Sequence, residues 1–354
     1  MKRFMNCGKT ASAAMTVTIR DVARRAKVAV GTVSRVLNNQ PDVNPKLRQQ
    51  VLRALNQLDY RPNARAQMLA RNSSPVVSFL LSNRDFLHLF HSRVLQGVEE
   101  YCDESGFFVI YTRFRYSASV SPVDLPLPNI LQSHGIADCM ILAGANYENF
   151  TESLDRRGLP YVLLANNFFG SETREPFNQV RFDDRNGAAD ATRYLLSLGH
   201  RDVWFIGETS MPWFRNRYQG YRAVMEENGL KPLSQELLLS DDRFLNGRNS
   251  IEMILQGDRP VTAVLAGNDE IAQGVWEGLA QAGKDVPRDV SLIGFDDLGG
   301  AGRLQILSSV RVDATELGRQ MAKMAVEKIK SKGRRIPEVL LPVSLVRRET
   351  CRPL

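Results

Sequence analysis

Apolar residues near the N-terminus recur at helical spacing in three short runs. The first is "TIRDVARRA" (18–26) and the second is "VGTVSRVL" (30–37), with "KVAV" (27–30) at the break between them. The third, within "NPKLRQQVLRALNQLD" (44–59), has Leu47, Val51, Leu55 and Leu58 on its inward face. Thr18 is suited to cap the first helix, and Asn44 followed by Pro45 the third. Two short helices, a tight turn and a closing third helix predict an all-α helix-turn-helix unit.

From Val76 onward the pattern changes to buried apolar runs that alternate with amphipathic helices. The runs typical of strands are "VVSFLL", "FFVIYT", "DCMILA", "YVLLA", "DVWFIG", "TAVLAG" and "VSLIGF". Helical runs between them include "SRVLQGVEEYCDE", "GAADATRYLLSLG", "EIAQGVWEGLAQAG" and "ATELGRQMAKMAVEKIKS". This alternation predicts an α/β body of parallel sheets covered by helices on both faces. Its length suits two doubly wound lobes, with ligands at the carboxyl ends of strands.

Charge separates the two parts of this 354-residue chain. Residues 1–75 hold 14 Lys and Arg against 3 Asp and Glu, a net charge of +11, whereas the remaining 279 residues hold 32 against 36, a net of −4. A basic head on a mildly acidic body indicates a module that binds a polyanion. A basic solubilising tail, or a three-helix domain without a role at DNA, is the alternative interpretation.

The polar face of residues 30–38 suits DNA, because the second helix of a helix-turn-helix enters the major groove with its N-terminal residues toward the bases. Arginine is the side chain best suited to bidentate contact with guanine. The candidates for base edges are Val30, Gly31 and Arg35, those for phosphates are Thr32, Ser34 and Asn38, and Thr18 is a further candidate DNA contact.

A short helical stretch follows, in "YRPNARAQMLARNSSP" (60–75). Pro62 and Asn63 open it, and "RNSSP" has the composition of a flexible linker. About eight residues of helix without a core are marginal in water, so we expect this segment to become ordered only on its target. Leu69, flanked by Ala66 and Ala70, is suited to wedge into the minor groove and kink the duplex.

These motifs together resemble the LacI/GalR family of bacterial transcriptional repressors, from about Val17 to about Arg348. The resemblance implies a homodimer whose paired heads bind a pseudo-palindromic operator, with Leu69 of each hinge helix inserted at its centre. It also implies a body of the periplasmic-binding-protein type with a small sugar-like effector between the lobes. Without leucine heptads at the C-terminus, a dimer is the expected assembly.

The corresponding domain boundaries are a disordered arm (1–15), a helix-turn-helix domain (16–61), a hinge helix and linker (62–75) and a two-lobed body (76–350). Lobe 1 is expected at about 76–176 and 308–337, and lobe 2 at about 177–307 and 338–350. The Pro-rich segment 117–129 is expected to be a loop inside the body.

Effector-binding candidates follow from the resemblance. "RNRYQGY" places Arg217, "AGNDEIAQG" places Asn268 and "LIGFDD" places Asp296 where a planar fork, an amide and a carboxylate suit the hydroxyls of a polyol. The aromatic candidates are Phe86, Phe90 and Trp213, and Phe295 and Trp276 are further possible stacking walls. Each of these aromatic residues is, taken alone, more typical of core than of a ligand contact. His91 either touches the ligand or, as is commoner for a histidine at a helix end, is only partly exposed.

The chain departs from the family pattern at two places. Where relatives usually have "AGVS", this chain has "AKVA", so Lys27 is expected in the left-handed conformation and Ala29 cannot cap the second helix. We therefore expect the head to fold less stably than its relatives. Where relatives carry Asp then Arg, this chain has Ala165, Asn166 and Asn167. One hydroxyl acceptor is missing, and Asn166 is a candidate substitute.

Other classes of protein have little support in the sequence. There is no nucleophile elbow, phosphate-binding glycine loop or metal-ligand spacing, so we predict no catalytic residues, metal or cofactor. The four cysteines are scattered, and no apolar run is long enough to span a bilayer. A location in the bacterial cytoplasm at the nucleoid is expected. A solute-binding receptor of a sugar transport system is the alternative interpretation, but such a receptor would need export. A protein that binds DNA without regard to its sequence is a further alternative. Met1 and Met15 are both possible starts.

Overall fold

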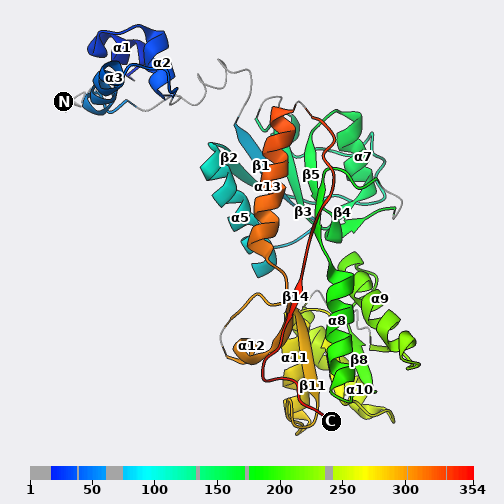
Figure 1. Ribbon diagram of the computed structural model, residues 1–354. Coiled ribbons are helices and arrows are strands. Elements are labelled where there is room, and N and C mark those ends of the chain that lie inside the picture. Colours follow the sequence, from blue (N-terminus) through cyan, green and yellow to red (C-terminus); the bar gives the residue numbers. More distant parts are fainter. Residues whose placement is uncertain are drawn as a thin grey trace, which may run out of the picture. The chain divides into compact units, whose positions relative to one another are not determined.

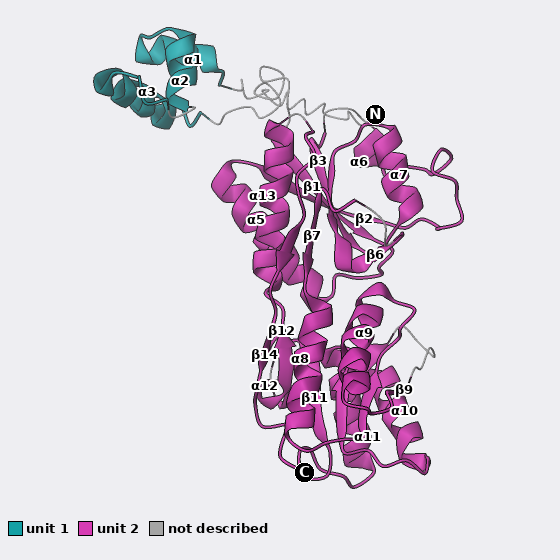
Figure 2. Cartoon of the chain, turned by 45° about the vertical axis from the view of Figure 1, so that its right-hand side comes forward, with its two compact units in different colours: residues 1–73 teal, residues 74–354 magenta. Residues whose placement is uncertain are grey.

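The computed structural model describes residues 17–37, 40–60, 75–132, 136–171, 175–235, 242–300, 302–331 and 333–354. The chain forms two compact units, residues 1–73 and residues 74–354 (Figure 2). The predicted arm at 1–15, the hinge helix and the DNA contacts assigned to Asn38, Asn63, Ala66 and Leu69 lie outside the described residues.

The N-terminal unit contains the three predicted helices, α1 (Ile19–Ala26), α2 (Val30–Leu37) and α3 (Pro45–Gln57). Val22, Val33 and Val51, one from each helix, are fully buried in its core. Leu47 was predicted on the inward face of α3, but it is 37% exposed. That expectation is wrong: the core cluster contains Val43 of the preceding loop and Val51 and Ala54 of α3, and Leu47 is not part of it.

The larger unit has two lobes, each built on a six-stranded sheet (Figure 1). Its helices are α5 (Leu89–Ser105), α6 (Asn129–Gln132), α7 (Glu148–Arg156), α8 (Asp184–Ser197), α9 (Pro212–Glu227), α10 (Arg243–Gln256), α11 (Asp269–Gln281), α12 (Arg303–Ile306), α13 (Ala314–Lys330) and the 3-10 turn η1 (Ala165–Asn167). Its strands are β1 (Val76–Ser82), β2 (Phe108–Phe114), β3 (Cys139–Gly144), β4 (Asn146–Tyr147), β5 (Tyr161–Leu164), β6 (Phe168–Phe169), β7 (Gln179–Phe182), β8 (Val203–Ile206), β9 (Leu233–Gln235), β10 (Ala263–Ala266), β11 (Ser291–Asp296), β12 (Ser308–Arg311), β13 (Val339–Leu341) and β14 (Ser344–Val346).

The sheet of lobe 1 is parallel throughout, in the order β13-β7-β5-β3-β1-β2. Successive side chains of its buried strands point to opposite faces. Phe79 of β1 packs in the cluster that contains Val94 of α5 and Leu317 of α13, whereas the next residue, Leu80, packs with Phe150 of α7. Helices therefore cover both faces, as the alternating sequence pattern predicted.

The sheet of lobe 2 has the order β14-β12-β11-β10-β8-β9 and is parallel except for the antiparallel edge strand β14. Phe205 of β8 packs with Tyr221 of α9, while Ile206 packs in the cluster that contains Ile251 of α10 and Ile271 of α11. The doubly wound arrangement is thus repeated in the second lobe. Both sheets present the carboxyl ends of their parallel strands toward the boundary between the lobes (Figure 1).

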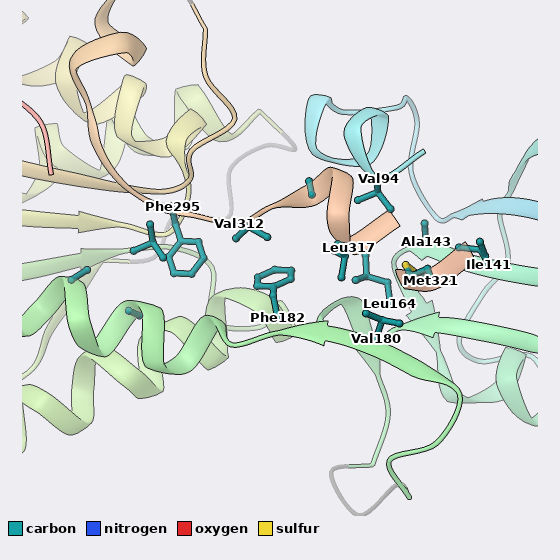
Figure 3. Close-up of a cluster of buried hydrophobic side chains, with 14 of the residues drawn as sticks. Val94, Ile141, Ala143, Leu164, Val180, Phe182, Phe295, Val312, Leu317 and Met321 are labelled. Atoms are coloured by element: carbon teal, nitrogen blue, oxygen red, sulfur yellow. The ribbon is translucent and has the colours of Figure 1, made fainter. Parts of the chain in front are cut away.

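The boundaries between the lobes differ from the predicted ones. Residues 179–182 (β7) and 339–341 (β13) belong to the sheet of lobe 1, and residues 308–311 (β12) belong to that of lobe 2. These strands have only three or four residues, too few for a clear apolar pattern. The chain therefore crosses between the lobes three times, after β7, β12 and β13. Figure 3 shows Phe182 and Val312, at two of these crossings, between Phe295 of lobe 2 and Leu317 of lobe 1.

Candidate functional site

The side of α2 that carries the predicted base-edge contacts is exposed. Val30 is 42% exposed, although it is apolar, and Gly31 and Arg35 are exposed beside it. Thr32 and Ser34, the candidates for phosphate contacts, are half-buried. Val33 and Val36 on the opposite side hold the helix in the core. The arrangement leaves the N-terminal half of α2 accessible to a groove.

Thr18 and Asp21 form a reciprocal cap at the start of α1. The Asp21 carboxylate accepts hydrogen bonds from the Thr18 backbone N–H at 3.0 Å and from its hydroxyl at 2.6 Å. These bonds hold the pKa of Asp21 below its ordinary value. Thr18 therefore has a capping role in addition to its predicted place near DNA.

Lys27 adopts the left-handed conformation that was predicted for it, with φ 52° and ψ 42°. Its neighbour Val28 donates a backbone hydrogen bond to the carbonyl oxygen of Ala23 at 3.0 Å, which closes the end of α1. Glycine is the residue that best tolerates this position, because a Cβ costs about 1 kcal/mol there. The turn before α2 is thus built with a strained residue.

We expect Lys27→Gly to raise the free energy of unfolding of the N-terminal unit by about 1 kcal/mol, because it removes that strain. Chemical denaturation of residues 15–72, followed by circular dichroism, measures the change. Arg25→Gly is the matched control: Arg25 is exposed within α1, so glycine there should destabilise by about 1 kcal/mol. Equal destabilisation by both changes would contradict the strain at Lys27.

A cavity lies between the two lobes at the carboxyl ends of their strands. The lobe 1 residues around it include Arg84, His88, Leu89, Phe90, His91, Asn167 and Phe182, and those of lobe 2 include Trp213, Phe214, Arg217, Arg243, Asn268, Asp269, Glu270, Asp296 and Leu298. Its free volume is about 600 Å³, part of it open to solvent.

The side chain of Arg217 is fixed by hydrogen bonds and by stacking on an aromatic ring. Its guanidinium donates to the Gly267 carbonyl oxygen at 2.5 Å and to the Asp296 carboxylate at 2.9 Å, and it stacks on the Phe295 ring with its carbon 3.8 Å from the ring centroid. Arg217 and Asp296 are both buried. A guanidinium fixed in this way presents its remaining donors in one orientation, which suits recognition of paired oxygen atoms.

Two carboxyl groups that line the cavity, those of Asp269 and Asp296, have raised pKa values. Burial raises the pKa of Asp296, and the Arg217 charge opposes that shift. Burial, and then the neighbouring Asp296 charge, raise the pKa of Asp269 to about 7, although its carboxylate accepts from the Ser309 hydroxyl at 2.6 Å. Asp296 also has φ 105°, an unusual backbone conformation for a residue with a Cβ. Strain and buried charge are therefore concentrated at this end of β11.

The raised pKa of Asp269 makes the stability of the larger unit depend on pH. Between the unfolded value of 3.8 and about 7 the folded state holds a proton that the unfolded chain has lost, so this group lowers stability as pH rises through that window. We expect Asp269→Asn to be more stable than the unchanged protein at pH 8 and to lose this advantage at pH 4. Urea denaturation at both values measures it. Asp190→Asn, where the carboxylate is 64% exposed, should show no such crossover.

The other predicted effector contacts are placed as follows. Asn268 caps α11, with its side-chain oxygen accepting from the Ile271 N–H at 3.0 Å, and it lines the cavity. Trp213 and Phe90 also line it, whereas Phe86 is 60% exposed and lines an adjoining space. Trp276 packs in the core of lobe 2. The structure thus brings five of the six candidates around one cavity.

Three polar residues of lobe 1 differ from expectation. Asn166 was the candidate substitute for the missing acceptor, but its amide donates to the Phe182 carbonyl at 2.9 Å and accepts from the Phe182 N–H at 3.0 Å. Asn167 lines the cavity instead. His91 is buried and also lines it, so the expectation of partial exposure is wrong. Helix α5 begins at Leu89 and places His91 against the cavity in its first turn.

Sequence reasoning missed three charged residues of the cavity. Arg84 follows the carboxyl end of β1, and that position could have indicated it. Arg243 is the first residue of α10, a helix that was not predicted, and no sequence signal identifies it. Glu270 of lobe 2 contacts both lobes. Its carboxylate lies 3.4 Å from Nδ1 of His88 in lobe 1 and 3.7 Å from the guanidinium of Arg243 in lobe 2.

Comparison with known proteins identifies the family. Residues 18–63 match the lacI family of bacterial regulatory proteins, and residues 192–351 match the periplasmic binding protein-like domain. Catabolite control protein A of Priestia megaterium is 31% identical over 291 residues, which cover 80% of this chain and 83% of the relative. The chain belongs to the LacI family. It is a transcriptional regulator with a helix-turn-helix domain, as the resemblance implied, and the solute-receptor alternative is not favoured.

Other LacI-family proteins share the whole architecture. The HTH-type transcriptional repressor CytR of Escherichia coli K12 is 29% identical, over 79% of this chain and 80% of the relative. The structure of the lac repressor dimer bound to operator and the anti-inducer ONPF superposes with a TM-score of 0.76 at 25% identity, covering 95% of this chain and 99% of that chain. The complex of the regulator CelR with cellobiose gives 0.66 at 25% identity, covering 94% and 99%.

In the described part of the chain, no helix combines the length and apolar character that crossing a membrane requires.

Proposed function

We propose that this LacI-family regulator is a repressor that binds a palindromic operator as a homodimer and releases it when a sugar-like effector occupies the inter-lobe cavity. The observation that carries the proposal is the fixed guanidinium of Arg217, buried between two lobes of a chain that also has an exposed recognition helix. The operator-bound lac repressor and the cellobiose-bound CelR support the two halves of this proposal. The protein would act without catalysis, in the cytoplasm at the nucleoid.

The three crossings between the lobes give the effector a route to the DNA-binding unit. A ligand held by Asp296 and Arg217 of lobe 2 and by His91 of lobe 1 would favour one angle between the lobes. Because a ligand shifts an equilibrium only by its preference for one state, effector and operator must weaken each other by the same factor. Leu69 of the hinge segment is proposed to lose its place in the minor groove when the effector binds.

The direct test is gel retardation of the full-length protein on a palindromic DNA selected from a random pool, over a range of salt concentrations. We expect retention that falls steeply with salt and that competitor DNA of random sequence does not abolish. Absence of retention at low salt would refute the DNA-binding part of the proposal. Equal competition by random DNA would instead support a sequence-indifferent binder.

An exposed apolar edge supports the proposed homodimer. Strand β2 is at one edge of the lobe 1 sheet, and its Phe108, Ile110 and Tyr111 are all exposed. Edge strands with exposed large apolar side chains are uncommon in monomers, because they promote association. We propose that a second copy of this chain covers β2.

We expect Ile110→Glu to convert the dimer to monomer in sedimentation equilibrium, because it would bury a charge in the interface. Operator affinity should fall with it, since two heads bind together only in the dimer. Leu340→Glu is the matched control, because Leu340 is exposed on β13 at the opposite edge of the same sheet. A dimer that survives Ile110→Glu would place the interface elsewhere.

A further inference from the structure

The segment of lobe 1 that joins β1 to α5 is anchored by side-chain contacts. Asn83 has a left-handed backbone with φ 50°. Its side chain donates to the Ala145 carbonyl oxygen at 3.1 Å and accepts from the Tyr116 N–H at 2.9 Å. The Asp85 carboxylate then pairs with Arg115. The segment is therefore held in one place by the body of lobe 1, and it presents its other side chains from a fixed position.

Phe86 lies in this anchored segment and lines the space that adjoins the inter-lobe cavity. It is 60% exposed, and Leu89, which lines the cavity itself, is 51% exposed. The Phe86 ring contacts the His88 ring, with the centroids 4.2 Å apart and the planes tilted by 36°. That contact orients the phenyl ring while most of it stays accessible. Exposed apolar side chains gathered at the edge of a cavity are typical of a ligand-binding groove.

The adjoining space is continuous with the cavity, because Arg84, His88 and Arg243 line both. Its walls are of two kinds. Phe86 supplies an apolar wall from lobe 1, whereas Glu208 and Arg243 supply hydrogen-bonding groups from lobe 2. A sugar ring has the same division, with apolar C–H faces and hydroxyl groups around its edge. The space therefore matches a second ring of a ligand whose first ring lies in the cavity.

Opposite charges lie close together around both spaces. Arg217 pairs with Asp296 at 2.9 Å, and Arg243 lies 3.7 Å from the carboxylate of Glu270. A neutral ligand adds no charge that these pairs would have to compensate.

We propose that the effector is a neutral disaccharide, whose first ring lies beside Arg217 and whose second ring stacks on Phe86. The hydroxyls of the second ring would bond to Glu208 and Arg243. This inference rests on the proposed effector site and makes Phe86 the residue that selects two rings over one. The stacked ring and the phenyl ring both remove apolar surface from water, and this is the source of the preference.

The first test is calorimetric titration of the full-length protein with matched glycosides. Methyl β-glucoside is compared with cellobiose, methyl α-glucoside with maltose, methyl β-galactoside with lactose, and methyl α-galactoside with melibiose. We expect at least one disaccharide to bind about tenfold or more tightly than its methyl glycoside. Methyl glycosides that bind as tightly as their disaccharides, or an absence of binding throughout the series, overturn the proposal.

The second test removes the phenyl ring. Phe86→Ala should weaken the disaccharide about tenfold and leave the affinity for the methyl glycoside within twofold, whereas Phe86→Tyr should retain most of the preference. Met253→Ala is the matched control, because Met253 is 51% exposed on α10 and lines neither space. A preference for two rings that survives Phe86→Ala, or equal losses for both ligands, overturns the proposal.

A phenyl glycoside of the same sugar separates stacking from hydrogen bonding, because its second ring has no hydroxyls. Phe86→Ala should weaken both the phenyl glycoside and the disaccharide, whereas Glu208→Ala should weaken the disaccharide alone. Losses of both ligands with Glu208→Ala would place the second ring differently and overturn the proposed arrangement.

Operator retention separates this inference from the proposed function. If methyl glycosides bind and release the operator as well as disaccharides do, only the inference about the second ring fails. If the protein retains the operator but no glycoside binds or releases it, the effector site fails with the inference. Release by a disaccharide at concentrations where its methyl glycoside has no effect supports both.

Discussion

Replacing Arg217 with alanine is expected to leave the repressor on its operator at effector concentrations that release the unchanged protein. The substitution removes the fixed guanidinium at the centre of the cavity, and the loss of hydrogen bonds to a charged group should weaken effector binding roughly 10- to 100-fold. Operator affinity without effector should change little, because Arg217 belongs to the larger unit. Gel retardation with increasing effector measures the shift.

Folding stability must be measured beside this response. Asp296 is buried, and without Arg217 its charge has no counter-charge at 2.9 Å. Breaking such a pair costs about 3–5 kcal/mol. Removing both partners in Arg217→Ala/Asp296→Ala should restore part of that stability while the effector response stays lost. Arg222→Ala, on the exposed side of the same helix, where Arg222 pairs with Glu226, should keep both stability and response. A normal response in Arg217→Ala would refute the site.

The second large effect is expected at the DNA. Arg35→Ala should weaken binding to the selected operator by about 1–3 kcal/mol and relax the preference at one base pair, because Arg35 is proposed to contact a guanine. The affinity for random DNA should fall only by the smaller factor expected when one positive charge is removed. Fluorescence anisotropy with operator and random duplexes measures both affinities.

Arg53→Ala is the matched control for Arg35. Arg53 is exposed on α3, so its removal changes the net charge of the N-terminal unit equally. It should weaken operator and random DNA by similar factors. If Arg35→Ala behaves in the same way, Arg35 contacts only phosphates and the assignment of base-edge contacts is wrong.

The N-terminal unit could be predicted closely from sequence because local rules determine its form. The first and third helices have recognisable starts at Thr18 and Asn44, and the apolar spacing fixes the buried side of each helix. The left-handed conformation of Lys27 was expected because this residue stands where the family usually has a turn glycine. Leu47 was misplaced because helical spacing does not reveal that Val43 of the preceding loop, and not Leu47, is part of the core cluster.

The fold class of the body could be predicted from the sequence, but the boundaries between its two lobes could not. Long buried strands such as β1 and β3 are continuous apolar runs, and they were identified directly. The chain passes from one lobe to the other after each of the short strands β7, β12 and β13. These strands have only three or four residues, too few to carry a periodic signal. Their pairing depends on tertiary contacts, which a single sequence does not display.

The residues of the cavity likewise divide into those that the sequence could locate and those that only the tertiary structure places there. Asp296 is the last residue of β11, Asn268 caps α11 and Arg217 lies in the second turn of α9. Resemblance located all three. Arg243 and His91 enter the cavity only because α10 and α5 are oriented toward it. A charged residue at the start of a helix is common, so Arg243 does not differ from an ordinary surface residue until the fold is known, and for His91 the sequence left a ligand contact and partial exposure both open.

The three connections between the lobes limit what the molecule can transmit. Strand β1, which follows the hinge segment, belongs to lobe 1, and lobe 2 has no other covalent tie to the N-terminal unit than through these connections. Under the proposed function, an effector that contacts lobe 2 therefore acts on the operator only through the way these three connections join lobe 2 to lobe 1.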